Sequence, residues 1–326
     1  MIQIQFIHSY NSIISLDNFL DAWKEFVVGK RQRKDVQEFE MNLMSNIIAL
    51  HQELAGKTYQ HSFYEAFNIS DPKPRNIHKA KVRDRLLHHA LHRLLYPFFD
   101  RTFIADSHSC RVNKGSHRAI ERFRLFSYKV SQNHTRTCWV LKCDIRKFFA
   151  NIDHMILKNI IARYISDQDI LWLLGKIIDS FSTRPNVGLP LGNLTSQLLV
   201  NIYMNEFDQW MKHHMKAKCY IRYADDFVIL SHDKAWLEEL LPKIGEFLEE
   251  TLHLQLHPDK VFIKTFASGV DFLGYVLKPN GTIIRTTTKR RILMKVNANN
   301  LPSYLGVCSH ANSHKLQTEL HRIVDQ

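Results

Sequence analysis

Two adjacent carboxylates, Asp225 and Asp226, stand between two short runs of β-forming residues. The runs cover residues 220–223 and 227–230, which predicts a strand–turn–strand unit with the acidic pair at its tight connection. Like charges this close repel, so one carboxyl group should stay protonated unless a cation neutralises both. Mg²⁺ is bound through one or two carboxylates together with substrate phosphates, so the pair predicts a metal-binding hairpin. The alternative is a solvated turn without a ligand.

A third carboxylate, Asp144, ends a second apolar run, residues 140–143, and lies 81 residues before Asp225. A strand beside the hairpin would bring Asp144 and Asp225 together so that they hold two ions about 3.5–4 Å apart, an arrangement used in phosphoryl and nucleotidyl transfer. Asp226 would be a supporting ligand. Taken by itself, Asp144 could instead cap the turn that follows it.

The segments that must position these carboxylates are predicted from periodicity and from glycine and proline. Helices are expected over residues 16–56 with a basic break at 29–34, over 82–99, 167–182, 194–216 and 233–252, and from Asp153. A loop is expected at residues 71–75, because proline is not tolerated in a helix interior. Two short strands around Lys260 and residues 272–275 precede a basic helical tail. This non-alternating order predicts an α+β fold rather than a doubly wound sheet.

Composition narrows the class of partner. The formal net charge is +12 and the isoelectric point is about 9.4, which favours a polyanion such as nucleic acid. No apolar stretch approaches the length of a membrane span and no signal peptide is recognised, so no membrane partner is expected. The five cysteines include no C-x-x-C pair, which favours reduced thiols and a cytoplasmic location.

Seven blocks of this sequence, in order, resemble the fingers and palm of reverse transcriptases. The blocks are residues 73–85, 107–115, 144–149, 188–197, 223–226, 254–260 and 272–275. Residues 223–226 read Tyr-Ala-Asp-Asp and match the Tyr-x-Asp-Asp metal-binding hairpin of that family. The resemblance implies a right-hand polymerase with an antiparallel palm sheet that carries the catalytic carboxylates. Its N-terminal region and fingers would be residues 1–138, its palm 139–280 with a helical insertion at about 160–195, and its short thumb 281–326.

The resemblance also implies an activity, RNA-directed DNA polymerisation from dNTPs, and roles for individual residues. Two Mg²⁺ ions, with Mn²⁺ as a possible substitute, would be held by Asp144, Asp225, Asp226 and the backbone of Ile145. One ion would activate the primer 3′-hydroxyl and the other would neutralise the triphosphate and pyrophosphate. The residues implied to bind the dNTP are Lys73, Arg75, Arg83, Phe149, Gln197 and Lys260. Lys73 and Arg75 would contact the triphosphate, with Arg83 as the alternative cation. Phe149 would be a steric gate against a ribose 2′-hydroxyl. A core aromatic is the alternative for Phe149, and a solvated basic loop for Lys73 and Arg75.

The segment 188–197 resembles one subclass, the reverse transcriptases of diversity-generating retroelements. Many relatives have Gln-Gly-x-x-x-Ser-Pro here, whereas this chain has Leu191 and Gly192 followed by Asn-Leu-Thr-Ser-Gln. Such systems copy a template-repeat RNA with frequent errors at adenines for mutagenic retrohoming, and they work with a small, basic, oligomeric accessory variability protein. The template, primer and fidelity set is Leu191, Gly192, Asn193, Ser196, Tyr223 and Ala224. Leu191 lacks the polar contacts that a Gln offers, which predicts looser discrimination. A helix start punctuated by Gly and Pro is the alternative.

Basic residues late in the chain fit the phosphates of a template–primer RNA·DNA duplex. The set predicted to contact phosphates is Arg285, Lys289, Arg290, Arg291 and Lys295. Residues 29–34 would be a second RNA-contacting patch, or a solvated charge run. Two other functions stay open: a retron-like or phage-defence reverse transcriptase, although the Val-Thr-Gly triplet of retrons is not found, and a non-catalytic RNA-binding protein with a polymerase fold.

Overall fold

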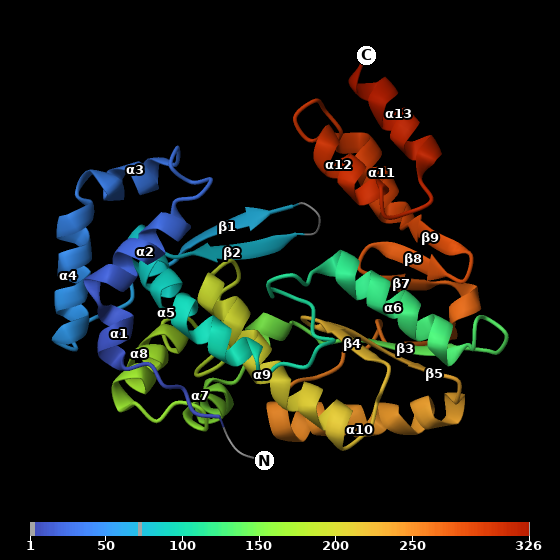
Figure 1. The fold of residues 1–326 in the computed structure, drawn as a ribbon, viewed down its shortest axis with the longest axis horizontal. Coiled ribbons are helices and arrows are strands. Elements are labelled where there is room, and N and C mark those ends of the chain that lie inside the picture. Colours follow the sequence, from blue (N-terminus) through green and yellow to red (C-terminus); the bar gives the residue numbers. More distant parts are fainter. Residues whose placement is uncertain (1–3, 71–73, 326) are drawn as a thin grey trace. The chain divides into compact units, whose positions relative to one another are not determined.

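The computed structural model describes residues 4–70 and 74–325 (Figure 1) and divides into two compact units. The first unit comprises residues 1–104, 147–210 and 247–255, and the second comprises 105–146, 211–246 and 256–326. Segments of the two units therefore alternate along the chain. The predicted division into fingers, palm and thumb is a different, contiguous one, and it stays a prediction.

The first unit is mainly helical. Its helices are α1 (Tyr10–Ile14), α2 (Leu16–Phe26), α3 (Lys34–Met41), α4 (Leu43–Ala55), α5 (Val82–Asp100), the short 3₁₀ turn η1 (Phe148–Asn151), α7 (His154–Ala162), α8 (Gln168–Ile178) and most of α9 (Leu194–His213). Helix α5 buries Leu86, Ala90 and Leu91 at the predicted helical spacing, and it packs against α2. Asp153 and Asp167 accept hydrogen bonds from the first amides of α7 and α8, so both helices begin where an aspartate caps them.

A hairpin of two exposed strands belongs to the same unit and was not predicted. Strand β1 (Glu65–Ile69) pairs antiparallel with β2 (Arg75–Lys79), with Phe67 opposite Ile77. The predicted loop at 71–75 is wrong at its end, because Arg75 begins β2; Pro74 directly before it suits the start of an edge strand. Residues 71–73, which include Lys73, lie outside the described residues.

The second unit is built on an antiparallel sheet of strand order β4-β5-β3-β6. Its strands are β3 (Trp139–Asp144), β4 (Tyr220–Tyr223), β5 (Asp226–Ser231) and β6 (Phe262–Thr265). Helix α6 (Ser116–Val130), also unpredicted, covers one face and shares a core with Val140, Val228 and Leu230 of the sheet (Figure 1). Because alternate strand residues share a face, Lys142, Asp144 and Asp226 lie on this same side of the sheet. The predicted α+β class is confirmed.

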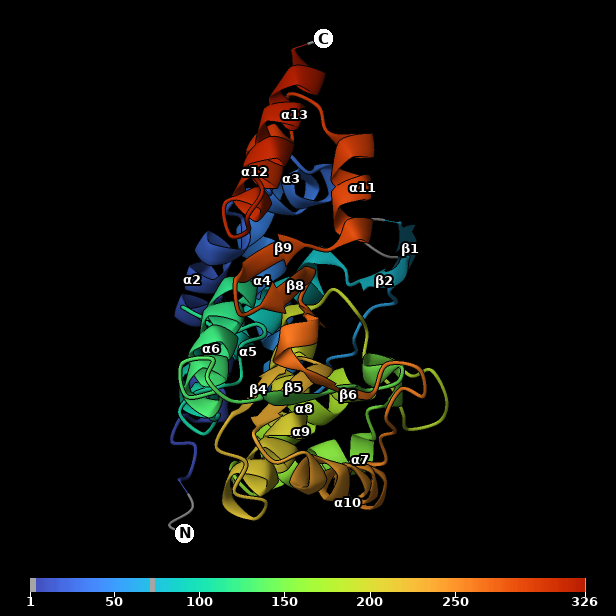
Figure 2. The ribbon, with the colours of Figure 1, turned by 90° about the vertical axis from the view of Figure 1, so that its right-hand side faces the viewer.

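The rest of the second unit is a smaller sheet followed by helices. Strands β7 (Val270–Phe272), β8 (Tyr275–Lys278) and β9 (Gly281–Ile284) follow β6 and the short turn η2 (Phe266–Ser268), and helices α11 (Thr286–Lys295), α12 (Leu301–Cys308) and α13 (His314–Val324) come last. Figure 2 shows these helices grouped beyond β9. Residues 272–275, expected near a strand, form a hairpin whose loop residues Leu273 and Gly274 both have positive φ, the requirement of a tight two-residue turn. The predicted basic helical tail is confirmed.

Helix α10 (Lys234–Leu252) contributes residues to both units. No helix in residues 4–70 and 74–325 is long and apolar enough to cross a membrane. All five cysteines lie within these ranges, and none of them forms a disulfide there.

Buried histidines on α5 make the folded state sensitive to mild acid. Burial lowers the pKa of His89 and of His92 to about 4, and it lowers the pKa of fully buried His88 well below its usual range, with His61 and Arg85 nearby adding to this effect. Between about pH 6.5 and 4 the unfolded chain binds protons that the folded chain does not, so stability is complete above pH 6.5 and falls as pH falls. The loss is at most about 1.4 kcal/mol per pH unit per histidine.

We expect chemical denaturation at pH 7.5, 6.5, 5.5 and 4.5 to show this slope of unfolding free energy against pH, and we expect His88→Leu to reduce it. The same replacement at His232, which is exposed on the surface, is the control.

Candidate functional site

The paired strands β3 and β5 bring the predicted carboxylates to one end of the sheet of the second unit. In the antiparallel register Asp144, the last residue of β3, stands opposite Asp226, the first residue of β5. Tyr223 ends β4 and pairs with Asp226, so Ala224 and Asp225 form the loop of a two-residue hairpin. The predicted strand–turn–strand unit is therefore present, and β3, which contains the predicted apolar run 140–143, lies directly beside it.

The backbone of this hairpin loop is strained and tied to the neighbouring strand. Ala224 has φ of +56°, in the left-handed region that costs a non-glycine residue about 1–2 kcal/mol. The Ile145 amide donates a hydrogen bond to the Asp225 carbonyl over 3.0 Å, and the His257 amide donates to the Asp144 carbonyl over 2.7 Å. The ends of β3 and the hairpin are thus held together by the main chain, and strain of this kind is typical of functional sites.

Two lysine ammonium groups stand against the carboxylates. Lys260 Nζ donates to Asp144 Oδ1 over 2.8 Å. Lys142 Nζ lies 3.3 Å from Asp226 Oδ2 and also donates to the Asp271 carbonyl over 2.9 Å. Both lysines come from the same unit as the carboxylates. Their ammonium groups are paired with the negative charge at this end of the sheet.

The electrostatics of Asp226 fit a site made for a cation. Burial is the main cause that raises the pKa of Asp226 to about 7; Asp144 and Asp225 act in the same direction, and Lys142 opposes them. Its second oxygen, Oδ1, is buried and has no hydrogen-bond partner. An ion bound by these oxygens would satisfy the orphaned atom and reverse the effect of the like charges. Across the described residues no three His, Cys, Asp or Glu side chains converge on one point as metal ligands, and Asp144 and Asp226 are each paired with a lysine. The donor set, three carboxylates, matches a hard divalent ion.

Among the described residues, the predicted nucleotide contacts other than Lys260 belong to the first unit. Phe149 is half-buried and its ring meets Phe148 edge-on, whereas Phe148 is fully buried, so Phe148 rather than Phe149 is the core aromatic of the pair. Arg75 is exposed at the start of β2. Arg83 bonds Glu53 over 2.9 Å and the Gln60 carbonyl over 2.8 Å, which commits its guanidinium to holding α5 against neighbouring segments. Of the two arginines, Arg75 is therefore the one available to an external phosphate.

The segment 188–197 is fastened to β2. The His78 amide donates to the Leu191 carbonyl over 3.0 Å, and the Asn193 amide group donates to the His78 carbonyl over 2.8 Å. Gly192 has φ of +102°, and a Cβ built on it would lie 2.7 Å from the Ile77 side chain. Asn193 and Ser196 are buried, Gln197 lies in the first turn of α9 and is half-buried, and Leu191 is half-buried. Glycine is thus required at 192 for both conformation and space.

The predicted phosphate contacts lie on or beside α11. Lys289, Arg290 and Lys295 are exposed along this helix, and Arg291 is half-buried. Arg285, just before the helix, pairs with Asp271 over 2.5 Å. Three of the five predicted cations are therefore presented to solvent in one short helix.

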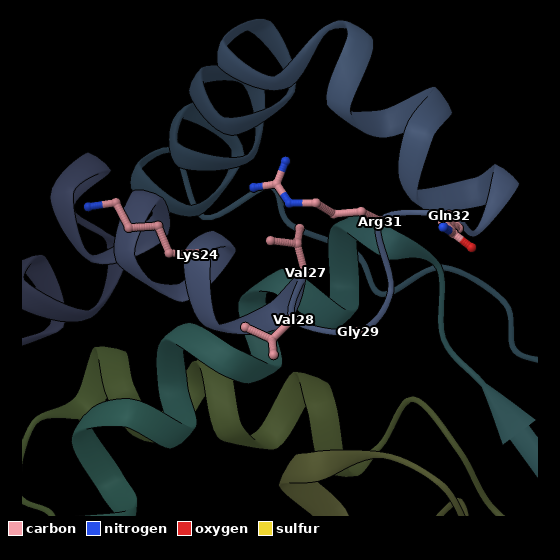
Figure 3. A pocket seen from close by; sticks show the side chains of 6 residues that line it. All are labelled: Lys24, Val27, Val28, Gly29, Arg31 and Gln32. Carbon is pink, nitrogen blue, oxygen red and sulfur yellow. The ribbon is translucent and has the colours of Figure 1, made fainter.

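The basic run at residues 29–34 lies beyond the end of α2, next to an open pocket (Figure 3) lined by Lys24, Val27, Val28, Gly29, Arg31 and Gln32. Figure 3 shows the Arg31 side chain running over this pocket, above Val27 and Val28. Arg31 bonds Glu40 over 2.8 Å, and Lys30 donates to the Phe26 carbonyl over 2.8 Å. Two of the basic side chains in this run therefore have partners within the protein. The RNA contact expected here stays a prediction.

Two features of the site were missed by the sequence analysis. Lys142 was passed over because a lone lysine inside an apolar strand carries no motif, although its position two residues before Asp144 places it on the same face. Arg222 was passed over because arginine is ordinarily a surface residue, whereas here its side chain is fully buried beside the hairpin. The position of Arg222 directly before Tyr223 was the available signal.

Comparison with known proteins identifies relatives over most of this chain. A family model described as Reverse transcriptase (RNA-dependent DNA polymerase) matches residues 70–277. Protein YkfC of Escherichia coli is 28% identical over 246 residues, which cover 64% of this chain and 64% of YkfC. The group II intron-encoded protein LtrA of Lactococcus lactis is 24% identical over 284 residues, which cover 64% of this chain and 46% of LtrA. The putative COX1/OXI3 intron 1 protein of Saccharomyces cerevisiae is 28% identical over 184 residues, 54% of this chain and 21% of that protein. The chain covers less than two thirds of the length of each of these relatives.

Proposed function

Because the chain belongs to the reverse transcriptase (RNA-dependent DNA polymerase) family, with homologues among group II intron-encoded proteins, we propose that it copies RNA into DNA. The observation that carries the proposal is the pairing of β3 with β5, which sets Asp144 opposite Asp226 at the base of the loop that holds Asp225. The substrates are dNTPs and a primer annealed to an RNA template. A net charge of +12 favours binding of the resulting duplex.

The proposed ligands of two Mg²⁺ ions are Asp144 and Asp225, with Asp226 in support and the Ile145 backbone beside them. Two such ions supply a more nucleophilic primer 3′-hydroxyl and charge neutralisation at the triphosphate. Lys260, now on Asp144, is free to turn to an incoming phosphate once a metal takes its place, because its side chain is 46% exposed. Lys142, only 12% exposed, keeps its bond to the Asp271 carbonyl and continues to hold Asp226 in position.

The residues of the first unit are proposed to select and hold the nucleotide. Arg75, with Lys73, would bind the triphosphate, and Gln197 would border the nucleotide as α9 begins. Phe149 presents part of its ring to solvent and would exclude a ribose 2′-hydroxyl. Exposed Lys289, Arg290 and Lys295 on α11 would bind duplex phosphates, which gives affinity without sequence preference. In this assignment residues 1–138 form the N-terminal region and fingers, 139–280 the palm and 281–326 the thumb.

We further propose that the enzyme is the cytoplasmic reverse transcriptase of a diversity-generating retroelement, paired with a template-repeat RNA and a small basic accessory protein. Support comes from Leu191 and Gly192, which the resemblance places where many reverse transcriptases have Gln-Gly. The Leu191 carbonyl bonds β2, so its backbone is fixed while its side chain offers no polar group to a template base. Selectivity falls when such a group is lost. Leu191→Gln should lower misincorporation opposite template adenine, and unchanged errors would count against this cause.

Primer extension on an RNA template, with the products sequenced, tests both levels of the proposal. We expect Mg²⁺-dependent DNA synthesis that a chelator abolishes, with errors concentrated opposite template adenines. Faithful, metal-dependent cDNA would keep the polymerase and remove the retroelement assignment, leaving a retron-like or defence enzyme. Failure to extend any primer, even with the native RNA and accessory protein present, would leave a non-catalytic RNA-binding protein.

A further inference from the structure

Arg222 carries a buried positive charge directly behind the catalytic hairpin. Its side chain is fully buried on β4, one residue before Tyr223. Among its contacts, Nη1 donates to the Ala224 carbonyl over 3.1 Å and Nη2 donates to the Ser107 hydroxyl over 3.0 Å. Burying a guanidinium is unfavourable unless its donors are used, so these contacts have a structural or functional purpose.

The backbone of Arg222 holds a second segment at the edge of the sheet. Its amide donates to the Asp106 carbonyl over 3.0 Å, and its carbonyl accepts from the His108 amide over 2.9 Å, which forms a short parallel bridge with Ser107. Asp106 is in turn anchored by Arg122 Nε over 2.6 Å and Lys212 Nζ over 3.2 Å. The segment from which Ser107 meets the guanidinium is therefore rigidly fixed, and it gives Arg222 a firm base.

The other end of the guanidinium acts on the loop that carries Asp225. Ala224 is in the left-handed conformation, and its carbonyl accepts the hydrogen bond from Arg222 Nη1. The next carbonyl, that of Asp225, accepts from the Ile145 amide at the end of β3. The backbone of the loop is thus held at the Ala224 carbonyl by the Arg222 side chain and at the Asp225 carbonyl by the strand of Asp144.

We propose that Arg222 is a positioning residue, which keeps the Ala224–Asp225 loop in its strained conformation and so presets Asp225 relative to Asp144 for metal binding. The inference rests on the proposed polymerase function. A 1 Å displacement of a group in a reacting site can lower a rate by about 100-fold. A loosened loop should therefore lower kcat more than it weakens nucleotide binding.

Arg222→Lys keeps the charge and removes the forked geometry that reaches Ala224 and Ser107 together. We expect a kcat about 10- to 100-fold lower on an RNA template, a KM for dNTP within about twofold of wild type, and a higher Mg²⁺ requirement. Two readouts do not depend on activity: faster amide hydrogen exchange at residues 222–226 and in Ile145, and a smaller rise in melting temperature on adding Mn²⁺. Arg136→Lys is the matched control, because the Arg136 Nε also donates to a carbonyl, that of Val130, but far along the chain from the hairpin.

A second substitution keeps the proposal open to refutation if Arg222→Lys folds poorly. Ala224→Gly removes the conformational penalty that Arg222 would offset, because glycine adopts positive φ freely. Arg222→Lys should therefore lower kcat less when Ala224 is already replaced by glycine than when it is introduced into the wild type. The same holds for the rise in melting temperature on adding Mn²⁺. Equal losses on both backgrounds, or a loss of melting temperature with kcat and the Mn²⁺ response unchanged, would reduce Arg222 to a purely structural residue. An inactive wild type that still responds to Mn²⁺ would overturn the proposed function and not this inference.

Discussion

Asp225→Asn should lower Mg²⁺-dependent DNA synthesis by about 1,000-fold or more, equivalent to about 4 kcal/mol of lost transition-state stabilisation. The amide has the shape of the carboxylate and would leave the hairpin intact, but it cannot neutralise a divalent ion. Asp144→Asn should have an effect of similar size, and Asp226→Asn a smaller one, since Asp226 is assigned a supporting role and Lys142 already holds it. Single-nucleotide incorporation measured under single-turnover conditions gives these rates.

The Asp225→Asn variant should be no less stable than wild type without metal. Asp144, Asp225 and Asp226 repel one another, and the pKa of Asp226, which burial and these neighbours raise to about 7, records that cost. Removing one charge relieves it, so thermal unfolding in a chelator should show an equal or higher melting temperature. Asp233→Asn, on the surface at the start of α10, serves as the control and should keep full activity. Normal synthesis by Asp225→Asn would contradict the assignment of the site.

Gly192→Ala should cost about 2 kcal/mol of stability and most of the activity, for reasons confined to the first unit. The φ of +102° is unfavourable for any residue with a Cβ, and the new atom would lie 2.7 Å from Ile77 Cγ2. Relief would require the Leu191–His78 bond between this segment and β2 to open. Denaturant unfolding and dNTP incorporation should both report the loss.

Gly175→Ala provides the matched control for Gly192→Ala. Gly175 lies inside α8 of the same unit, where a Cβ would meet only Lys158 Cε at 4.0 Å. Alanine is the better helix former by about 1 kcal/mol, so this variant should be neutral or more stable. If the two substitutions behave alike, the tight packing of Gly192 on β2 does not limit the enzyme.

The sequence predicts the parts of this fold that have strong periodicity or special residues. The apolar run before Asp144 and the two runs of β-forming residues around Asp225 indicated the two central strands, since short apolar runs are typical of buried strands. The hairpin β1–β2 escaped prediction because both strands are largely exposed and show no apolar alternation. Helix α6 was missed for a different reason: its buried residues Ala119, Ile120, Phe123 and Phe126 do follow the helical spacing, and this available signal was not used.

Some residues of the site can be predicted from the sequence pattern, whereas others are identified only from the tertiary structure. Acidic residues next to strands can be found by eye, and their pairing across β3 and β5 follows from the register. The fork of Arg222 between Ala224 and Ser107 joins positions 115 residues apart, and no local pattern contains it. The bond of Arg83 to Glu53 likewise changes the choice among the predicted triphosphate contacts, and it too depends on tertiary structure.

The alternation of the two units along the chain has a consequence for how the protein is made. The first unit draws its last segment from residues 247–255, so it lacks that segment until most of the polypeptide has been synthesised. A ribosome adds roughly 5–20 residues each second, so the N-terminal helices wait many seconds for these partners, and during that time their apolar faces are open to aggregation. Overproduction in a host without ample chaperones should therefore yield inclusion bodies more readily than the charge of the mature protein suggests, and slower translation would not by itself cure it.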